Sequence, residues 1–349
     1  MNNAASAMHQ DESSRRQFLE EQLALELGWD LNLFHGAPFQ VAGLSLRMRA
    51  EYAIVNPTAF SPPGRPRLNH LRLTKWLKFG NSVEQLHHLF YLAKSYRIRQ
   101  IVLPPSTLFQ ARDLGEFQVT TASDDSAKLG LGLAGLFYYL EPFCLKRPTE
   151  NLLESASRYV RPMLSDLLQE IDPRVQEQDL VLHFRAGDIF SNPVAHYGQP
   201  PLAYYLAAIQ REKPSRTWLV FEDRANPCID AAEAWLQRHG LEVVIQSGSL
   251  EEDLRVLLSA RRLVIGQGTF GSSVAMLSTH LRRLYTFKSE LWDDLPLPGL
   301  ERIQAVDIDG GYTKALLSKN WTASPEQCAL MLSYSAEALR FHLAPNAAG

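Results

Sequence analysis

Cysteine is scarce in this chain, and none of it is clustered. The three cysteines, Cys144, Cys228 and Cys328, lie far apart. An odd and sparse set argues against a disulfide scaffold and is typical of a reducing compartment. No cysteine or histidine group has the spacing of a zinc site. The sequence therefore predicts a fold held together without disulfides or structural zinc.

Long hydrophobic runs and an excess of one charge are also missing. No run reaches the roughly 18 apolar residues of a membrane helix, and the polar stretch 1–16 has no apolar core of a secretory signal. The net charge is −3, and no basic stripe interleaved with aromatics suggests a nucleic-acid partner. We expect a cytoplasmic protein, with loose attachment to the inner face of a membrane as the alternative.

The length and composition indicate two ordinary globular domains. The chain has 349 residues and a hydrophobic content of 46%, which suits two domains of average size. We expect a disordered tail over 1–16, an amino-terminal α/β domain over 17–155 and a carboxy-terminal Rossmann-like domain over 156–349.

Strands and helices alternate through the second half of the chain. This alternation predicts a parallel, doubly wound sheet. The expected strands cover 180–184, 218–221, 242–246, 263–265 and 284–287, and the expected helices cover 202–210, 229–238, 250–259, 272–280 and 324–341.

The first half carries one clear loop, helix and strand unit. Apolar residues at helical spacing predict a helix over 83–96, followed by a strand over 98–103 that ends at Pro104 and Pro105. Further helices are expected over 129–140 and 150–171. This pattern also belongs to an α/β domain.

Three polar residues follow the buried apolar run 180–182: His183, Arg185 and Asp188. The carboxyl end of a strand is where open α/β sheets bind ligands. The planar guanidinium of Arg185 suits a phosphate or pyrophosphate, and Asp188 can hold that guanidinium or serve as a base. An ordinary ion pair at a strand end is the alternative.

Two segments match the pattern G-x-G-x-x-G. The first, 130–135, follows a polar stretch instead of a strand, so we interpret it as packing in a helix or turn. The second, 266–271, follows a predicted strand and opens a predicted helix. Backbone N–H groups at such a helix start form an anion site, to which Thr269, Ser272 and Ser273 add hydroxyls. A tight turn with a capped helix is the alternative.

The same loop allows a nicotinamide dinucleotide, with Glu290 placed to hold a ribose. A dinucleotide fingerprint, however, follows the first strand of its domain, whereas this loop follows the fourth. A hydride-transfer enzyme also gives Arg185 no role. An NAD(P)-dependent oxidoreductase remains an alternative, as does a non-catalytic nucleotide-sugar-binding protein.

Three elements together resemble a known group of enzymes. They are the His183, Arg185 and Asp188 motif, the later loop 268–273, and the segment 79–85 followed by the strand that ends at Pro104. In this order they resemble the fucosyltransferase superfamily, the inverting GT-B-like enzymes that include the α1,2-, α1,6- and protein O-fucosyltransferases. The resemblance extends from about residue 78 to residue 273.

The resemblance implies two Rossmann-like α/β domains facing a cleft, and a glycosyltransferase that moves fucose from GDP-fucose. No cofactor is implied, and the acceptor would be an oligosaccharide or glycolipid in cell-surface polysaccharide synthesis. The implied donor-binding residues are His183, Arg185, Glu222, Asp223, Gly268, Thr269, Phe270, Gly271, Ser272 and Ser273, and the implied catalytic residues are Arg185, Asp188 and Asn81.

The chain departs from the family pattern at three positions. Ala186 stands where several members carry a second Arg, Lys78 where some carry Arg, and Gly271 where Ser is common. These departures leave the sugar open more than the fold.

Breaking the bond between sugar and diphosphate needs positive charge at the leaving oxygen. Arg185 and the helix start at 268–273 can supply it in place of a divalent metal. Asp307-Ile308-Asp309 matches a metal-binding string, but the glycines that follow favour a turn. Candidates for the base are Asp188, Glu222, Asp223 and His196. Glu222 and Asp223 could instead contact the nucleoside or form a solvated turn, and Lys75 and Lys78 could attract an anionic donor.

Overall fold

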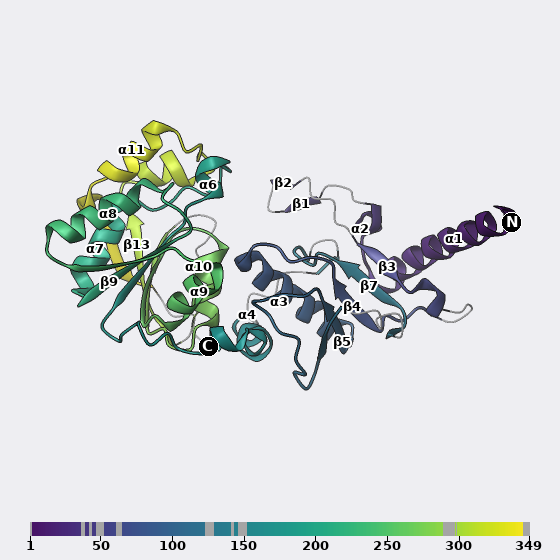
Figure 1. The fold of residues 1–349 in the computed structure, drawn as a ribbon. Coiled ribbons are helices and arrows are strands. Elements are labelled where there is room, and N and C mark those ends of the chain that lie inside the picture. Colours follow the sequence, from purple (N-terminus) through teal and green to yellow (C-terminus); the bar gives the residue numbers. More distant parts are fainter. Residues whose placement is uncertain are drawn as a thin grey trace. The chain divides into compact units, whose positions relative to one another are not determined.

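The computed structural model divides the chain into two compact units, Met1–Leu164 and Ser165–Gly349 (Figure 1). The boundary therefore lies later in the chain than the expected position after residue 155. The structure describes residues 2–35, 39–41, 44–46, 52–60, 65–122, 129–140, 143–145, 152–288, 297 and 299–344. Each unit has its own sheet, so the expected pair of α/β domains is confirmed.

The carboxy-terminal unit contains a seven-stranded sheet in the order β10-β9-β8-β11-β12-β13-β14. The strands are β8 (Leu180–Phe184), β9 (Arg216–Phe221), β10 (Glu242–Gln246), β11 (Arg262–Ile265), β12 (Arg283–Phe287), β13 (Glu301–Asp307) and β14 (Leu339–Leu343). Every neighbouring pair is parallel except β13 and β14. The chain therefore winds outward from β8 in one direction and then from β11 in the other, which confirms the doubly wound sheet.

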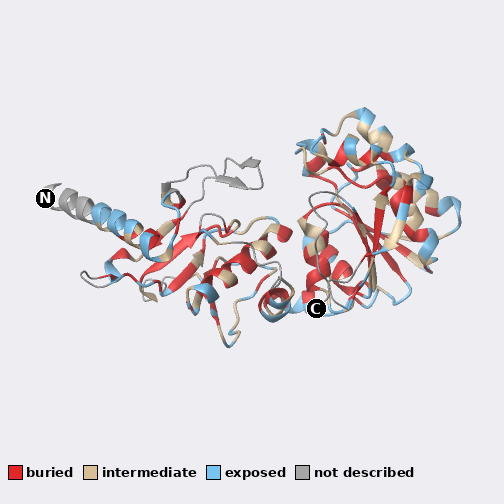
Figure 2. Cartoon of the chain, turned by 180° about the vertical axis from the view of Figure 1, so that it is seen from behind, coloured by how far each residue is buried: buried red, intermediate tan, exposed pale blue. Residues whose placement is uncertain are grey.

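Helices connect these strands because each crossover between parallel strands must return over a face of the sheet. They are α7 (Leu202–Glu212), α8 (Pro227–Arg238), α9 (Leu250–Ser259) and α10 (Thr269–Leu277), with the short α6 (Asp188–Ser191) directly after β8. All five residues of β8 are buried, and Figure 2 shows buried strands in the interior of this unit. A strand that is covered on both faces buries every side chain, so its sequence is one continuous apolar run.

The end of the chain differs from the single helix expected over 324–341. Helix α11 (Pro325–Ser333) ends at Tyr334, a one-turn helix η7 (Ala336–Ala338) follows, and β14 completes the sheet edge. The apolar residues of β14 alternate with polar ones, and the Phe341 ring lies parallel to that of Tyr204, with centroids 6.2 Å apart. Period-two alternation favours a strand over a helix.

The amino-terminal unit has a five-stranded sheet in the order β3-β7-β4-β5-β6. The strands are β3 (Ala53–Val55), β4 (His70–Leu73), β5 (Gln100–Leu103), β6 (Gln118–Thr121) and β7 (Gly132–Gly135). Helix α3 (Phe79–Ser95) joins β4 to β5, as the sequence predicts. It begins earlier than expected, so Asn81 lies in its first turn and not in a loop before it.

Residues 129–140 do not form the expected helix, because they contain the buried strand β7. A Cβ on Gly132 would overlap the ring of His70, and one on Gly135 would overlap the ring of Tyr52. The two glycines of the first G-x-G-x-x-G match are therefore packing positions, but in a strand and not in the helix or turn that we expected.

The segment 150–171 is not one helix either. Its described part is broken into α4 (Leu152–Ser155), the π-helical η4 (Ala156–Val160), the 3₁₀ turn η5 (Arg161–Met163) and α5 (Asp166–Gln169). Pro162 prevents a continuous α-helical ladder at this point, and the boundary between the units follows.

Helix α1 (Asn2–Leu27) covers the expected disordered tail. The sequence contains no glycine or proline before Gly28 to interrupt a helix. The remaining elements are α2 (Asn32–His35), the paired strands β1 (Phe39–Val41) and β2 (Leu44–Leu46), η1 (Pro57–Ala59) and η6 (Thr313–Leu317). Within the described ranges, no helix combines the length and hydropathy that a membrane span requires.

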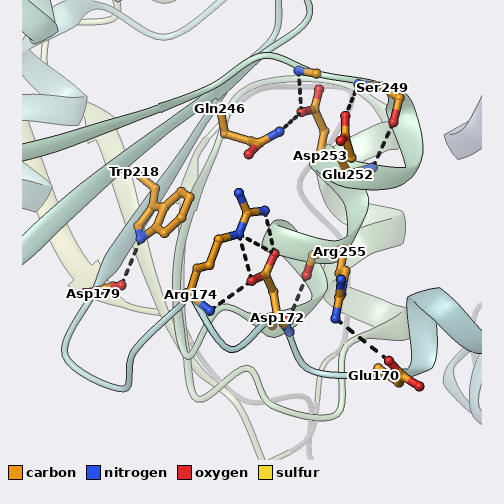
Figure 3. A network of polar contacts seen from close by, with 12 residues as sticks. Glu170, Asp172, Arg174, Asp179, Trp218, Gln246, Ser249, Glu252, Asp253 and Arg255 are labelled. Carbon is orange, nitrogen blue, oxygen red and sulfur yellow. Dashed lines mark hydrogen bonds and ion pairs between the residues drawn. The ribbon is translucent and has the colours of Figure 1, made fainter.

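Ion pairs fasten the amino-terminal ends of the central strands (Figure 3). Asp179, directly before β8, accepts hydrogen bonds from Trp218 Nε1 at 2.8 Å and Arg216 Nη2 at 2.6 Å. Nearby, Asp172 pairs with Arg174, whereas the capping box of Ser249 and Glu252 begins α9 just after the carboxyl end of β10. The Asp179 contacts fix the sheet at the edge opposite the carboxyl ends of its strands.

Candidate functional site

The carboxyl ends of β8 and β11 meet at the point where the strand order reverses. Ile265 at the end of β11 pairs with His183 on β8. The chain leaves β8 toward one face of the sheet and β11 toward the other, so the two loops diverge from neighbouring strand ends. The loop that follows β8 and carries Arg185 (the Arg185 loop) therefore begins beside the loop that follows β11 and starts at Gly266 (the glycine loop).

Glu222 and Asp223, in the loop after β9, contact the turn that carries Arg185. Gly187 has φ +67°, and a Cβ there would overlap the carboxylate of Glu222. Its N–H donates to Asp223 Oδ1 at 3.1 Å, an oxygen that also accepts from Ala225 N at 2.9 Å. The positive φ favours glycine here, whereas the exposed Glu222 side chain could move away from a Cβ.

The guanidinium of Arg185 is oriented but not fully used. Its Nη2 pairs with Asp188 Oδ1 at 2.7 Å, while its Nε is buried and has no hydrogen-bond partner. The backbone oxygen of Arg185 accepts from Asn226 Nδ2 at 3.0 Å. A buried donor without a partner calls for an explanation, and an anionic ligand is one.

The glycine loop opens a nine-residue helix directly from β11. Gly268 precedes α10 with φ 121° and ψ 171°, a conformation open essentially to glycine alone, and provides no side-chain cap. A Cβ on Gly271 would lie 2.8 Å from Cβ of Ile265, so this glycine lets the helix approach the strand closely. Thr269 and Ser272 are partly exposed, whereas Ser273 is buried.

His183 joins the two motifs. Its ring stacks on that of Phe270 with centroids 4.7 Å apart and planes 27° from parallel. Burial and the nearby Arg185 charge lower the pKa of His183 to about 3. The imidazole is therefore neutral at pH 7, and its buried Nδ1 has no hydrogen-bond partner.

Glu222 and Asp223 lie at the carboxyl end of β9, on the other side of the Arg185 loop. The carboxylate of Asp223 holds backbone N–H groups of two loops, so it works here as a clamp. Glu222 is exposed beside Gly187. Of the two, Glu222 is the better placed to meet hydroxyls of a ligand.

Two buried amides near the site escaped sequence reasoning. Asn226 caps α8 by accepting from Cys228 N at 3.0 Å while it holds the Arg185 backbone. Its place before Pro227 is a recognisable helix-start signal. Gln199 contacts the glycine loop, and the sequence gives no local signal for that contact.

The remaining predicted residues are spread over both units. Asn81, Lys75 and Lys78 belong to the amino-terminal unit, whereas every predicted donor-binding residue belongs to the carboxy-terminal one. His196 is in the loop before Tyr197, and its buried Nδ1 has no hydrogen-bond partner. Glu290 lies outside the described residues.

Asp307 is committed to the fold. Its Oδ2 accepts from Thr313 N at 2.9 Å and its Oδ1 from the Tyr334 hydroxyl at 2.5 Å, so the string 307–309 is used as a structural turn. Across the described part of the chain, no three His, Cys, Asp or Glu side chains converge as metal ligands would.

Comparisons with known proteins find structural similarity alone. No protein-family model and no curated protein sequence matches the chain. Similar solved structures include POFUT1 in complex with GDP (12% identity, TM-score 0.46, covering 63% of this chain and 98% of that one) and NodZ α-1,6-fucosyltransferase co-crystallised with GDP (11%, 0.35, 64% and 96%). The heptosyltransferase WaaC of E. coli is also similar (12%, 0.35, 67% and 92%).

At these identities and TM-scores the similarities carry no argument about the activity of this chain. Chemically, the cluster itself offers a guanidinium, a helix start and a neutral imidazole at one sheet edge, which together suit an anionic group such as a diphosphate.

Proposed function

We propose that this protein is an inverting glycosyltransferase that uses a nucleoside diphosphate sugar. The observation that carries the proposal is that the Arg185 loop and the glycine loop leave the adjacent strands β8 and β11 side by side, with Arg185 Nε buried and without a partner. A dinucleotide loop would follow β8, whereas this glycine loop follows β11.

In the proposed reaction, the bond between the anomeric carbon and the diphosphate breaks as an acceptor hydroxyl attacks from the opposite face. Negative charge grows on the departing phosphate oxygen. Arg185 and the N–H groups at the start of α10 stabilise that charge, and the loss of one such donor typically costs about 2.7–4 kcal/mol of transition-state stabilisation. No cofactor enters this scheme.

We further propose that the donor is GDP-fucose and the acceptor a glycan or glycolipid of the cell surface. The support is the motif resemblance, which implies that His183 lies near the nucleotide, Phe270 at the phosphates and Asn81 near the reaction centre. In this proposal, the enzyme acts at the cytoplasmic face of a membrane. Fractionation of cells that express the full chain tests it, and recovery only in a secreted fraction contradicts it.

A thermal-shift panel of GDP, ADP, UDP, CMP and NAD tests the main proposal. We expect GDP to raise the melting temperature most, and Arg185→Ala to abolish that shift. Arg224→Ala is a matched control, because Arg224 lies in the neighbouring loop but is paired with Asp230 and Glu233. Stabilisation by NAD alone would overturn the proposal, and binding of GDP without transfer or donor hydrolysis would favour a non-catalytic binding protein.

A further inference from the structure

The buried side chain of Gln199 holds the backbone of the glycine loop and has no part in the chemistry proposed above. Gln199 is completely buried and lies in the connection between α6 and α7. Its Oε1 accepts from Gln267 N at 3.1 Å, and its Nε2 donates to Gln267 O at 3.3 Å. One side-chain amide thus pairs with both backbone groups of the residue directly before Gly268.

Further hydrogen bonds extend this clasp on both sides. Tyr204, at the start of α7, donates its hydroxyl to Ile265 O at 3.1 Å, and Gln267 Nε2 donates to Phe287 O at 2.7 Å. Gln199 is itself held, since the buried Tyr312 hydroxyl donates to its backbone oxygen at 2.6 Å. Residues 265–267 are therefore fixed directly to α7 and to β12. They are also linked to Tyr312 through Gln199.

The identity of Gly266 fits this arrangement. A Cβ at position 266 would lie 2.5 Å from Gln199 Oε1 and 3.7 Å from Cβ of Arg185. Any side chain there would push the amide away from Gln267. The close approach of Gln199 to the backbone thus explains the first glycine of the loop, which needs no positive φ.

We propose that Gln199 is a positioning residue that preorganises the glycine loop for the diphosphate, an inference that rests on the proposed function. N–H groups stabilise an anion most when they are already aimed before it arrives. Losing the amide leaves the loop backbone to be ordered by the ligand, and this ordering lowers affinity. Gln199 acts through Gln267 and Gly268 and touches no reacting atom.

The amino-terminal unit supplies a matched control. Gln85 is also completely buried, and its Nε2 donates to Leu136 O at 2.7 Å while its Oε1 accepts from Leu77 N at 3.1 Å. This amide joins the loops after β4 and β7, far along the chain from the donor residues. Gln85→Met and Gln199→Met each remove one buried amide and keep a side chain of similar length.

The experiment compares GDP affinity by calorimetry with hydrogen exchange of segment 266–270 in the ligand-free full chain. We expect Gln199→Met to bind GDP about tenfold more weakly, the effect of losing about two ordinary hydrogen bonds, and to exchange faster in this segment. Gln85→Met should leave both readouts unchanged. Gln199→Glu keeps the acceptor for Gln267 N and should restore part of the protection.

Wild-type affinity and wild-type exchange in Gln199→Met would overturn the inference. If Gln199→Met does not fold, Gly266→Ala tests the same inference. The Cβ of the new alanine displaces the Gln199 amide, so this variant should also bind GDP more weakly. A wild-type chain that binds no GDP contradicts the proposed function instead. In that case, the exchange of segment 266–270 alone decides whether Gln199 fixes the loop.

Discussion

At the scale of the residue, Arg185 and Asp188 define two competing roles for one carboxylate. Asp188 Oδ1 lies 2.7 Å from Arg185 Nη2, and the Asp188 side chain is half-exposed. This contact fits a role for Asp188 in orienting Arg185, and the role of a base is the alternative.

Replacing Asp188 with Asn separates the two roles. Asn keeps the shape and an acceptor for Arg185, so we expect GDP to bind a few-fold more weakly and turnover to fall by less than about tenfold. Loss of a general base would instead lower turnover by about 10²–10⁴ while GDP affinity stays unchanged. Steady-state kinetics together with calorimetry distinguish these outcomes.

His183 should make stability depend on pH in a defined direction. Its pKa falls from the usual 6.5 to about 3 in the folded chain, so between these values the unfolded state binds more protons. Stability then falls as the pH drops below about 6.5, by up to about 1.4 kcal/mol per pH unit from this group. Urea unfolding of the wild type and His183→Gln at pH 4.5 to 7.5 measures the difference. Equal slopes for the two proteins would contradict a neutral buried imidazole.

At the scale of the element, β7 depends on its glycines for space. A Cβ on Gly132 would occupy the place of the His70 ring on the adjacent strand. We expect Gly132→Ala to lower the free energy of unfolding by about 1–3 kcal/mol, the usual effect of overpacking. Gly311→Ala is the control, since no atom lies within 4 Å of a Cβ there. Denaturant unfolding measures both, and equal stability of the two variants would contradict the packing explanation.

The same strand shows where sequence reasoning succeeds and where it does not. Buried parallel strands such as β8 and β11 are short apolar runs, so their positions are predictable. The strand β7 contains two glycines in four residues and has no such run. The alternating β14 follows a helix without a proline or glycine between them, which hides the change of period.

Some features of the candidate site are likewise predictable from the sequence, and others are not. That the loops after two strands share a sheet edge follows from parallel pairing, so the Arg185 loop and the glycine loop are predictable as neighbours. The contact between Gln199 and Gln267 joins residues 68 positions apart and depends on the packed position of α7. Asp223 serving as a clamp likewise follows from a loop conformation that composition does not specify.

At the scale of the whole molecule, the proposed donor site and the proposed acceptor side fall on separate units. The sheet order β10-β9-β8-β11-β12-β13-β14 is complete within Ser165–Gly349, and so are the residues that hold the Arg185 and glycine loops. Asn81 belongs to the other unit. Donor binding and sugar transfer should therefore be separable by dividing the chain.

A protein limited to Ser165–Gly349 tests this division. Because each unit buries its own core, we expect this fragment to fold and to bind GDP with the affinity of the full chain, and Arg185→Ala to abolish binding in both. The fragment should transfer no sugar, since the reacting groups of the acceptor side are missing. Calorimetry and a transfer assay on the two proteins measure this. A folded fragment that has lost GDP binding would show that the amino-terminal unit completes the donor site, and a fragment that still transfers sugar would remove Asn81 from the mechanism.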